Sequence, residues 1–109
     1  LRVMLGRKIA LGPGKIDLLR LIGETGSIAE AAKRMKMSYM RAWMLVEQME
    51  ECFEEPLIDR QRGGAERGGA RLTAVGERVL ELYRQMEEAC VDAATPSWKE
   101  LEKRLRKRG

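Results

Sequence analysis

The stretch that decides the fold is Gly26–Phe53, with the sequence GSIAEAAKRMKMSYMRAWMLVEQMEECF. Ser27–Glu30 has the form of a capping box, in which serine accepts a bond from the glutamate amide and the glutamate side chain reaches back to the serine amide. Ser38 is a natural N-cap for a second helix, and Lys36-Met37 form the turn before it. The stretch therefore predicts two helices joined by a tight turn, the arrangement that helix-turn-helix proteins lay on a DNA duplex.

Apolar residues recur at helical spacing on one face of each of these two helices. Small alanines on the first helix let the second helix approach closely. We expect a shared core that also includes Trp43. Its other members are Ile28, Ala31, Ala32 and Met35 from the first helix and Ala42, Val46, Met49 and Phe53 from the second.

The segments on both sides complete one small domain, because 109 residues leave little room for a second core. A period of two from Val3 to Leu11 predicts one short strand, and helical spacing from Ile16 to Ile22 predicts the next helix. Leu57–Gln61 and Ala70–Leu72 have the pattern of two strands. Glycines at 63–69 predict a hairpin loop between them, since glycine adopts positive φ at little steric cost. This pair is the expected wing.

A long helix follows Thr73, its expected N-cap. Its apolar residues alternate by four and three positions from Val75 onward, the spacing that seats one helix against another. We expect this helix to end at Thr95-Pro96 and a short last helix to open at Ser97. The predicted division is a winged domain at 1–94 and a short basic helix or tail at 95–109. The residues predicted to form a dimer contact are Val79, Leu82, Met86, Ala89 and Ala93.

Composition excludes several classes of protein. The chain has no histidine, and Cys52 and Cys90 lack the paired spacing of a zinc site. Both cysteines fall on helical apolar patterns, so we expect reduced core residues in a cytoplasmic protein. No apolar run approaches the length of a membrane span. No constellation of catalytic residues is visible, so we expect neither an enzyme nor a cofactor bound by this chain.

Charge and side-chain chemistry point to DNA as the partner. The net charge is +4, and basic residues gather in the two-helix stretch and the wing. At the start of the second helix Arg41 could donate two bonds to guanine, and Ser38 and Tyr39 could bind phosphates or base edges. Met40 and Met44 share one face and would pack on thymine methyl groups or, alternatively, on another protein. The full set predicted to bind DNA is Lys36, Ser38, Tyr39, Met40, Arg41, Met44, Arg62 and Arg67.

Two segments closely resemble the N-terminal domain of the ModE family of molybdate-responsive transcriptional regulators. They are TGSIAEAAKRMKMSYMRAWMLVEQME at 25–50 and PLIDRQRGG followed by GGARLTAVGERVLELY at 56–83. LysR-type regulators share a similar winged domain and Leu72-Thr73 followed by Gly76, but usually lack Tyr39 with Ala42-Trp43. The resemblance covers about Leu1 to Ala94. It implies a mainly α winged helix-turn-helix with a small β wing and a long C-terminal dimerisation helix.

We therefore expect a dimeric, sequence-specific DNA-binding transcriptional regulator, which is a cytoplasmic homodimer on a palindromic operator near molybdenum-related genes. The family's molybdate sites lie in a separate C-terminal region, and none of its oxyanion motifs occurs in this chain. The chain is then a stand-alone DNA-binding member or a fragment. The alternative is a protein-interaction or dimerisation module that keeps the winged fold without reading DNA, which Met40 and Met44 favour.

Overall fold

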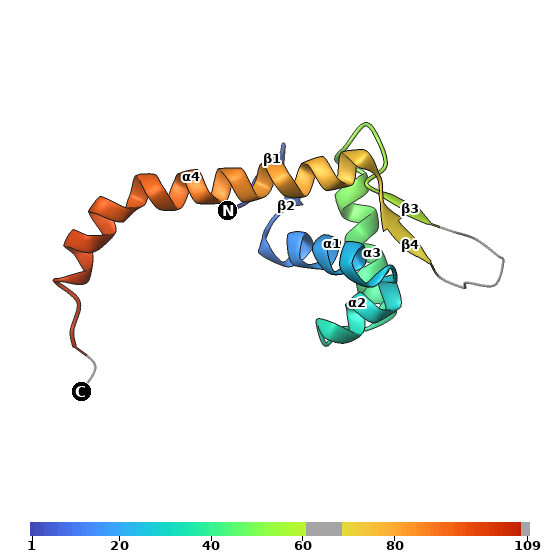
Figure 1. Ribbon diagram of the computed structural model, residues 1–109, viewed down its shortest axis with the longest axis horizontal. Coiled ribbons are helices and arrows are strands. Elements are labelled where there is room, and N and C mark those ends of the chain that lie inside the picture. The colour runs from blue at the N-terminus through green and yellow to red at the C-terminus, as the bar shows by residue number, and fades with distance from the viewer. Residues whose placement is uncertain (61–68, 108–109) are drawn as a thin grey trace.

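A helical body with two small hairpins and one protruding helix makes up the computed structural model, which describes residues 1–60 and 69–107 (Figure 1). The extents of 58 × 34 × 24 Å reflect that helix. This confirms the predicted fold class. In chain order the elements are β1 (Val3–Leu5), β2 (Lys8–Leu11), α1 (Pro13–Thr25), α2 (Ile28–Arg34), α3 (Tyr39–Glu50), β3 (Ile58–Arg60), β4 (Ala70–Leu72) and α4 (Ala74–Glu102).

The junction between α1 and α2 forms largely as the sequence predicts. Gly26 ends α1 in the left-handed conformation, with φ of 72°. The Ser27 hydroxyl caps α2 by accepting from the Glu30 amide at 3.1 Å. The reciprocal half of the capping box does not form, because the Ser27 amide donates to Thr25 Oγ1 instead. The Glu30 carboxylate lies 3.6 Å from Arg34.

The tight turn between α2 and α3 confirms the second prediction. Lys36 takes the left-handed conformation with φ of 57°, and the Met37 amide donates to the Ala32 carbonyl at 3.0 Å. Ser38 then caps α3 by accepting from the Arg41 amide at 3.1 Å. These local bonds fix the direction in which α3 leaves the turn.

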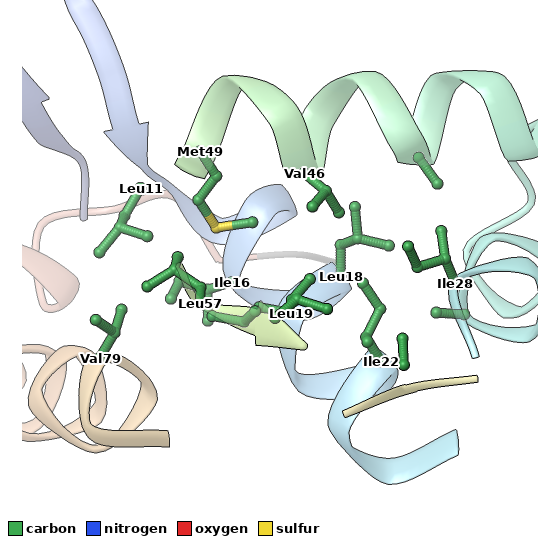
Figure 2. Close-up of a cluster of buried hydrophobic side chains, with 14 of the residues drawn as sticks. Leu11, Ile16, Leu18, Leu19, Ile22, Ile28, Val46, Met49, Leu57 and Val79 are labelled. Carbon is green, nitrogen blue, oxygen red and sulfur yellow. The ribbon is translucent and has the colours of Figure 1, made fainter. Parts of the chain in front are cut away.

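The core lies between α1, α2 and α3 and is closed by β3 and the first turns of α4 (Figure 2). The predicted small residues Ala31, Ala32 and Ala42 are all buried, which lets α2 and α3 pack closely. Trp43 is half-buried and packs against this core. The largest fully buried side chains are those of Leu18, Leu19, Ile22, Val46, Met49, Leu57 and Tyr83.

The predicted wing strands pair as an antiparallel hairpin, Ile58 opposite Leu72 and Arg60 opposite Ala70. The predicted loop at 63–69 falls mostly on residues 61–68, outside the described residues. The wing is tied to the body at its base, where the Ala70 amide donates to the Gly26 carbonyl at 2.9 Å.

The sequence interpretation was wrong at the N-terminus, where a hairpin replaces the predicted single strand. Gly6 turns the chain with φ of 60°, and β1 and β2 pair antiparallel. Leu1 at the start of this hairpin lies against α4, because the Tyr83 hydroxyl donates to its carbonyl. Burial raises the pKa of Tyr83, which favours the protonated phenol that donates this bond.

The predicted end of the long helix at Thr95-Pro96 was also wrong. The single helix α4 continues through Pro96 to Glu102, and Ser97 opens no new helix. Proline cannot donate to the carbonyl four residues back, and the last turns of α4 bend away from the axis of the rest (Figure 1). The Thr95 hydroxyl donates to the Val91 carbonyl at 2.6 Å just before the bend. The division at residue 94 remains a prediction.

Only one of the two cysteines is packed as the sequence predicts. Cys52 is half-buried against the core, whereas Cys90 is exposed on α4. In the part of the chain that the structure describes, no helix is long and apolar enough to cross a membrane.

Candidate nucleic-acid interface

The start of α3 presents large side chains to solvent. Tyr39 is 50% exposed, Met40 64% and Met44 52%. Ser38 and Arg41 are also exposed, so all five residues predicted on this helix are brought together on one surface. Figure 1 shows that α3 begins at the end of the body remote from α4. The surface is therefore clear of the protruding helix.

This exposure follows from how α3 packs. Ala42, Val46 and Met49 are fully buried and hold one face of the helix against α1 and α2. At about 100° per residue, Met40 and Met44 lie about half a turn around the axis from that buried face. They therefore project away from the body, while Arg41 lies to one side of them.

Basic residues surround this surface. Lys33, Lys36 and Arg41 are exposed around the turn between α2 and α3. Arg34 is exposed as well, although it lies close to Glu30. This end of the helix pair therefore carries a positive potential, which suits a polyanion. We call Lys36, Ser38, Tyr39, Met40, Arg41 and Met44 the reading surface.

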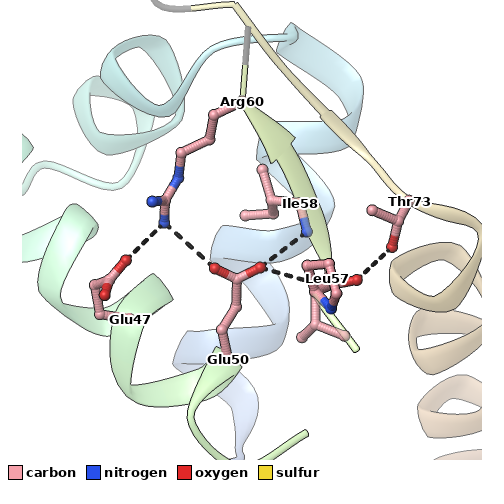
Figure 3. Close-up of polar contacts among 7 residues, drawn as sticks. Glu47, Glu50, Leu57, Ile58, Arg60 and Thr73 are labelled. Atoms are coloured by element: carbon pink, nitrogen blue, oxygen red, sulfur yellow. Dashed lines mark hydrogen bonds and ion pairs between the residues drawn. The ribbon is translucent and has the colours of Figure 1, made fainter. Parts of the chain in front are cut away.

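The acidic end of α3 has a structural role that the sequence interpretation missed. Glu50 Oε2 accepts from the Leu57 amide at 2.9 Å and from the Ile58 amide at 3.1 Å (Figure 3). Because β3 begins there, this one carboxylate ties the start of the wing to α3.

Arg60 completes the same attachment. One guanidinium nitrogen lies 3.0 Å from Glu47 and 3.4 Å from Glu50, and the guanidinium carbon lies 5.3 Å from the centroid of the Trp43 ring. Arg60, Glu47, Glu50 and Trp43 form the Arg60 cluster, which joins β3 to α3. Arg60 is a basic residue of the wing, but its side chain packs against α3.

The two wing arginines predicted to bind DNA, Arg62 and Arg67, lie outside the described residues. Arg71, on the returning strand, is exposed. The described part of the wing therefore consists of its two strands, β3 and β4, and the DNA contacts predicted for Arg62 and Arg67 stay predictions.

The predicted dimer residues lie along α4, and all but one are exposed. Val79 is buried at the start of the helix, whereas Leu82 is 40% and Met86 41% exposed. Ala89 and Ala93 follow on the part of α4 beyond Tyr83, where every residue from Arg84 to Ala94 is exposed.

Other kinds of site find no support in residues 1–60 and 69–107. No group of three His, Cys, Asp or Glu side chains in these segments could hold a metal ion. The grooves between α1 and α4 are open and lined by paired charges such as Arg20 with Asp17 and Arg84 with Glu81.

Known proteins with similar sequences include transcriptional regulators and a molybdenum transport protein. Transcriptional regulator ModE of Haemophilus influenzae is 39% identical over 87 residues, which are 80% of this chain and 34% of that protein. The DNA-binding transcriptional dual regulator ModE of Escherichia coli K12 is 39% identical over 83 residues, 76% of this chain and 32% of that protein. Molybdenum transport protein ModE of Azotobacter vinelandii is 41% identical over 78 residues, 72% of this chain and 29% of that protein. The chain thus spans about a third of the length of these relatives.

A solved structure confirms the fold. The CbnR DBD–DNA complex matches with a TM-score of 0.65 and 23% identity, over 84% of this chain and 99% of that one. Full-length CbnR complexed with its target DNA matches with a TM-score of 0.62 and 24% identity, over 80% of this chain and 28% of that one.

A family model identifies the chain more directly. The model described as bacterial regulatory helix-turn-helix protein, lysR family, matches residues 14–77, which run from the start of α1 to the first turn of α4. The predicted similarity to ModE regulators is confirmed by the relatives above. The chain belongs to the lysR family of bacterial regulatory helix-turn-helix proteins, with ModE regulators among its relatives.

Proposed function

We propose that this chain is the DNA-reading part of a dimeric, sequence-specific transcriptional regulator that acts in the cytoplasm on a palindromic operator. The observation that carries the proposal is the reading surface, where the start of α3 is exposed together with the cations Lys33, Lys36 and Arg41 in and around the turn before it. An α-helix fits the major groove of B-DNA, and helix-turn-helix proteins contact bases with the N-terminal residues of the second helix.

The four polar residues of the reading surface each have a proposed role. Arg41 donates two bonds to guanine O6 and N7. Ser38 and Tyr39 bind a phosphate or a base edge, and Lys36 neutralises a phosphate. Phosphates would repel Glu47 and Glu50, but these two carboxylates lie at the far end of α3 and form ion pairs with Arg60. This polarity supports a helix that enters the groove by its N-terminus.

The wing is the second proposed contact. From the sequence, Arg62 and Arg67 would meet phosphates or the minor groove beside the helix. The attachment of β3 to α3 through the Arg60 cluster supports this proposal, because it fixes the base of the wing relative to the reading helix.

Dimerisation through α4 is the third part of the proposal. Leu82 and Met86 are apolar and exposed, and they continue at heptad spacing with Ala89 and Ala93, whereas Val79, at the start of the same series, is buried in the chain's own core. A two-fold dimer would place two reading helices on one face of the duplex, about 34–36 Å apart. The names of the relatives, which include a molybdenum transport protein ModE, support target genes concerned with molybdenum.

A second candidate function is a protein-interaction module that retains the fold without reading DNA. Exposed Met40 and Met44 favour it, because flexible methionines are common on surfaces that bind other proteins. The basic residues around them favour DNA. A direct DNA titration separates the two functions.

The test is a fluorescence titration of labelled duplexes at two salt concentrations. We expect affinity to fall more than about ten-fold between about 50 and about 200 mM salt, because binding releases counterions from the phosphates. Arg41→Ala should reduce the preference for operator over random DNA by about ten-fold or more.

The matched control is Arg84→Ala, which removes the same charge from an exposed position on α4. This variant should keep the sequence preference of the original chain. Affinity that does not depend on salt would overturn the phosphate contacts, and unchanged discrimination in Arg41→Ala would overturn the base-reading role.

A further inference from the structure

Two exposed methionines occupy the centre of the reading surface. Met40 and Met44 are 64% and 52% exposed, one helical turn apart on α3. Across the helix from them lies the buried face formed by Ala42 and Val46. Nothing in the described chain covers the two side chains, so α3 presents an apolar strip where a reading helix normally offers hydrogen-bonding groups.

An apolar strip that enters the major groove can make apolar contact with one group on the base edges. Among the base edges there, only thymine carries a methyl group, at C5, and apolar side chains discriminate by contacting it. Methionine suits this contact, because its unbranched, polarisable side chain adapts its shape to the surface that it meets.

The charges around the strip support DNA rather than protein as the occupant. Arg41 lies beside the methionines on the first turn of α3, and Lys36 lies in the turn before it. Both are exposed cations, and no carboxylate is available to them from the far end of α3, where Arg60 holds Glu47 and Glu50. The phosphates of DNA would neutralise these two cations, and the base edges would then lie against the methionines.

We infer that Met40 and Met44 determine specificity by packing on thymine C5 methyl groups, so that each half of the operator carries thymines next to the guanine bound by Arg41. The inference rests on the proposed DNA-reading function and specifies its chemistry. The part of the recognition that the two methionines supply is then apolar and insensitive to salt, because no charge takes part in it.

The experiment removes the methyl group from the DNA rather than the methionine from the protein. Bound duplexes are first selected from random sequence, and each thymine of the selected site is then replaced in turn by deoxyuridine. This replacement deletes the C5 methyl group and leaves the O4 acceptor and the base pair intact. At least one replacement in each half-site should weaken binding about four-fold, the effect expected from one buried methyl group.

The protein variant Met40→Gln/Met44→Gln supplies the second arm of the experiment. It should bind the thymine and deoxyuridine duplexes equally, because glutamine keeps the length and helix propensity of methionine but loses the apolar contact. Met4→Gln changes an equally exposed methionine on β1 and is the matched control. It should keep the four-fold preference for thymine.

The two proposals fail in different ways. Selection of a site in which no thymine responds to loss of its methyl group would overturn the thymine inference and leave the DNA-reading function standing. The same holds if the glutamine variant retains the preference for thymine. If no duplex is selected at all, the DNA-reading function fails, and the thymine inference fails with it.

Discussion

At the scale of single residues, Gly76 sets how closely α4 approaches the wing. A Cβ atom at this position would lie 2.2 Å from the Leu57 carbonyl oxygen, a backbone atom that cannot move aside. The same carbonyl accepts from the Thr73 amide at 2.9 Å, and the Thr73 hydroxyl accepts from the Gly76 amide at 3.0 Å. The first turn of α4 is thus held against the chain just before β3.

Gly76→Ala should therefore destabilise the fold by about 3 kcal/mol, because the added methyl group forces the two backbones apart. Urea denaturation followed by circular dichroism measures this loss. Gly14→Ala is the control, since a Cβ at Gly14 meets nothing within 4 Å. It should leave stability unchanged or raise it by up to about 1 kcal/mol. Equal stability of the two variants would contradict the close approach.

Residues that act locally could be predicted from the sequence. Ser27, Ser38 and Thr73 cap α2, α3 and α4 as expected, because an N-cap depends on a side chain and an amide three residues away. Arg60 could not be predicted. Its carboxylate partners lie 10 and 13 residues earlier in the chain, and only the packing of β3 against α3 brings them together.

At the scale of elements, the Arg60 cluster couples α3 to the wing. The Glu50 carboxylate accepts from two half-buried backbone amides as well as from Arg60. Glu50→Ala would leave these donors without their acceptor, so we expect a loss of about 2–3 kcal/mol in the free energy of unfolding.

Glu54→Ala provides the comparison for that loss, because it removes a carboxylate from an exposed position a few residues further on. Its effect should stay within about 0.5 kcal/mol. Thermal or urea denaturation of both variants tests the prediction, and a Glu50→Ala protein as stable as Glu54→Ala would show that the carboxylate does not hold the wing.

The elements that the sequence interpretation missed share a physical cause. The period of two from Val3 to Leu11 fits one strand, but the single glycine at position 6 reverses the chain between β1 and β2. Pro96 was expected to end α4, yet the helix continues, since an exposed helix can bend away from the proline ring without disturbing a neighbour. At Gly6 the backbone preference of one residue interrupts the predicted strand, whereas at Pro96 the helix continues despite the proline. The spacing of apolar residues does not predict which of these outcomes occurs.

At the scale of the whole molecule, the described chain leaves apolar side chains of α4 uncovered. The helix spans 29 residues, but its burial in the body ends at Tyr83. Leu82 and Met86 remain exposed on the proposed seam. A helix with this much unburied apolar surface gains stability when it packs against a second copy.

Leu82→Glu should accordingly weaken the dimer about ten-fold or more, because it places unpaired charges in the seam of both copies. Sedimentation at several protein concentrations measures the dissociation constant. Val91→Glu introduces the same charge at an exposed apolar residue that lies off the heptad seam, and it should leave the dimer intact. Equal weakening by both variants, or a monomeric original chain, would rule out the seam.

The central claim is that the exposed start of α3 reads DNA sequence from a two-fold dimer. Selection of bound duplexes from random DNA tests it most directly. The account predicts enrichment of a two-fold symmetric site whose half-sites lie about 10–10.5 base pairs apart, each with a guanine beside thymines. Recovery of sequences with no enrichment over the starting pool would contradict the account.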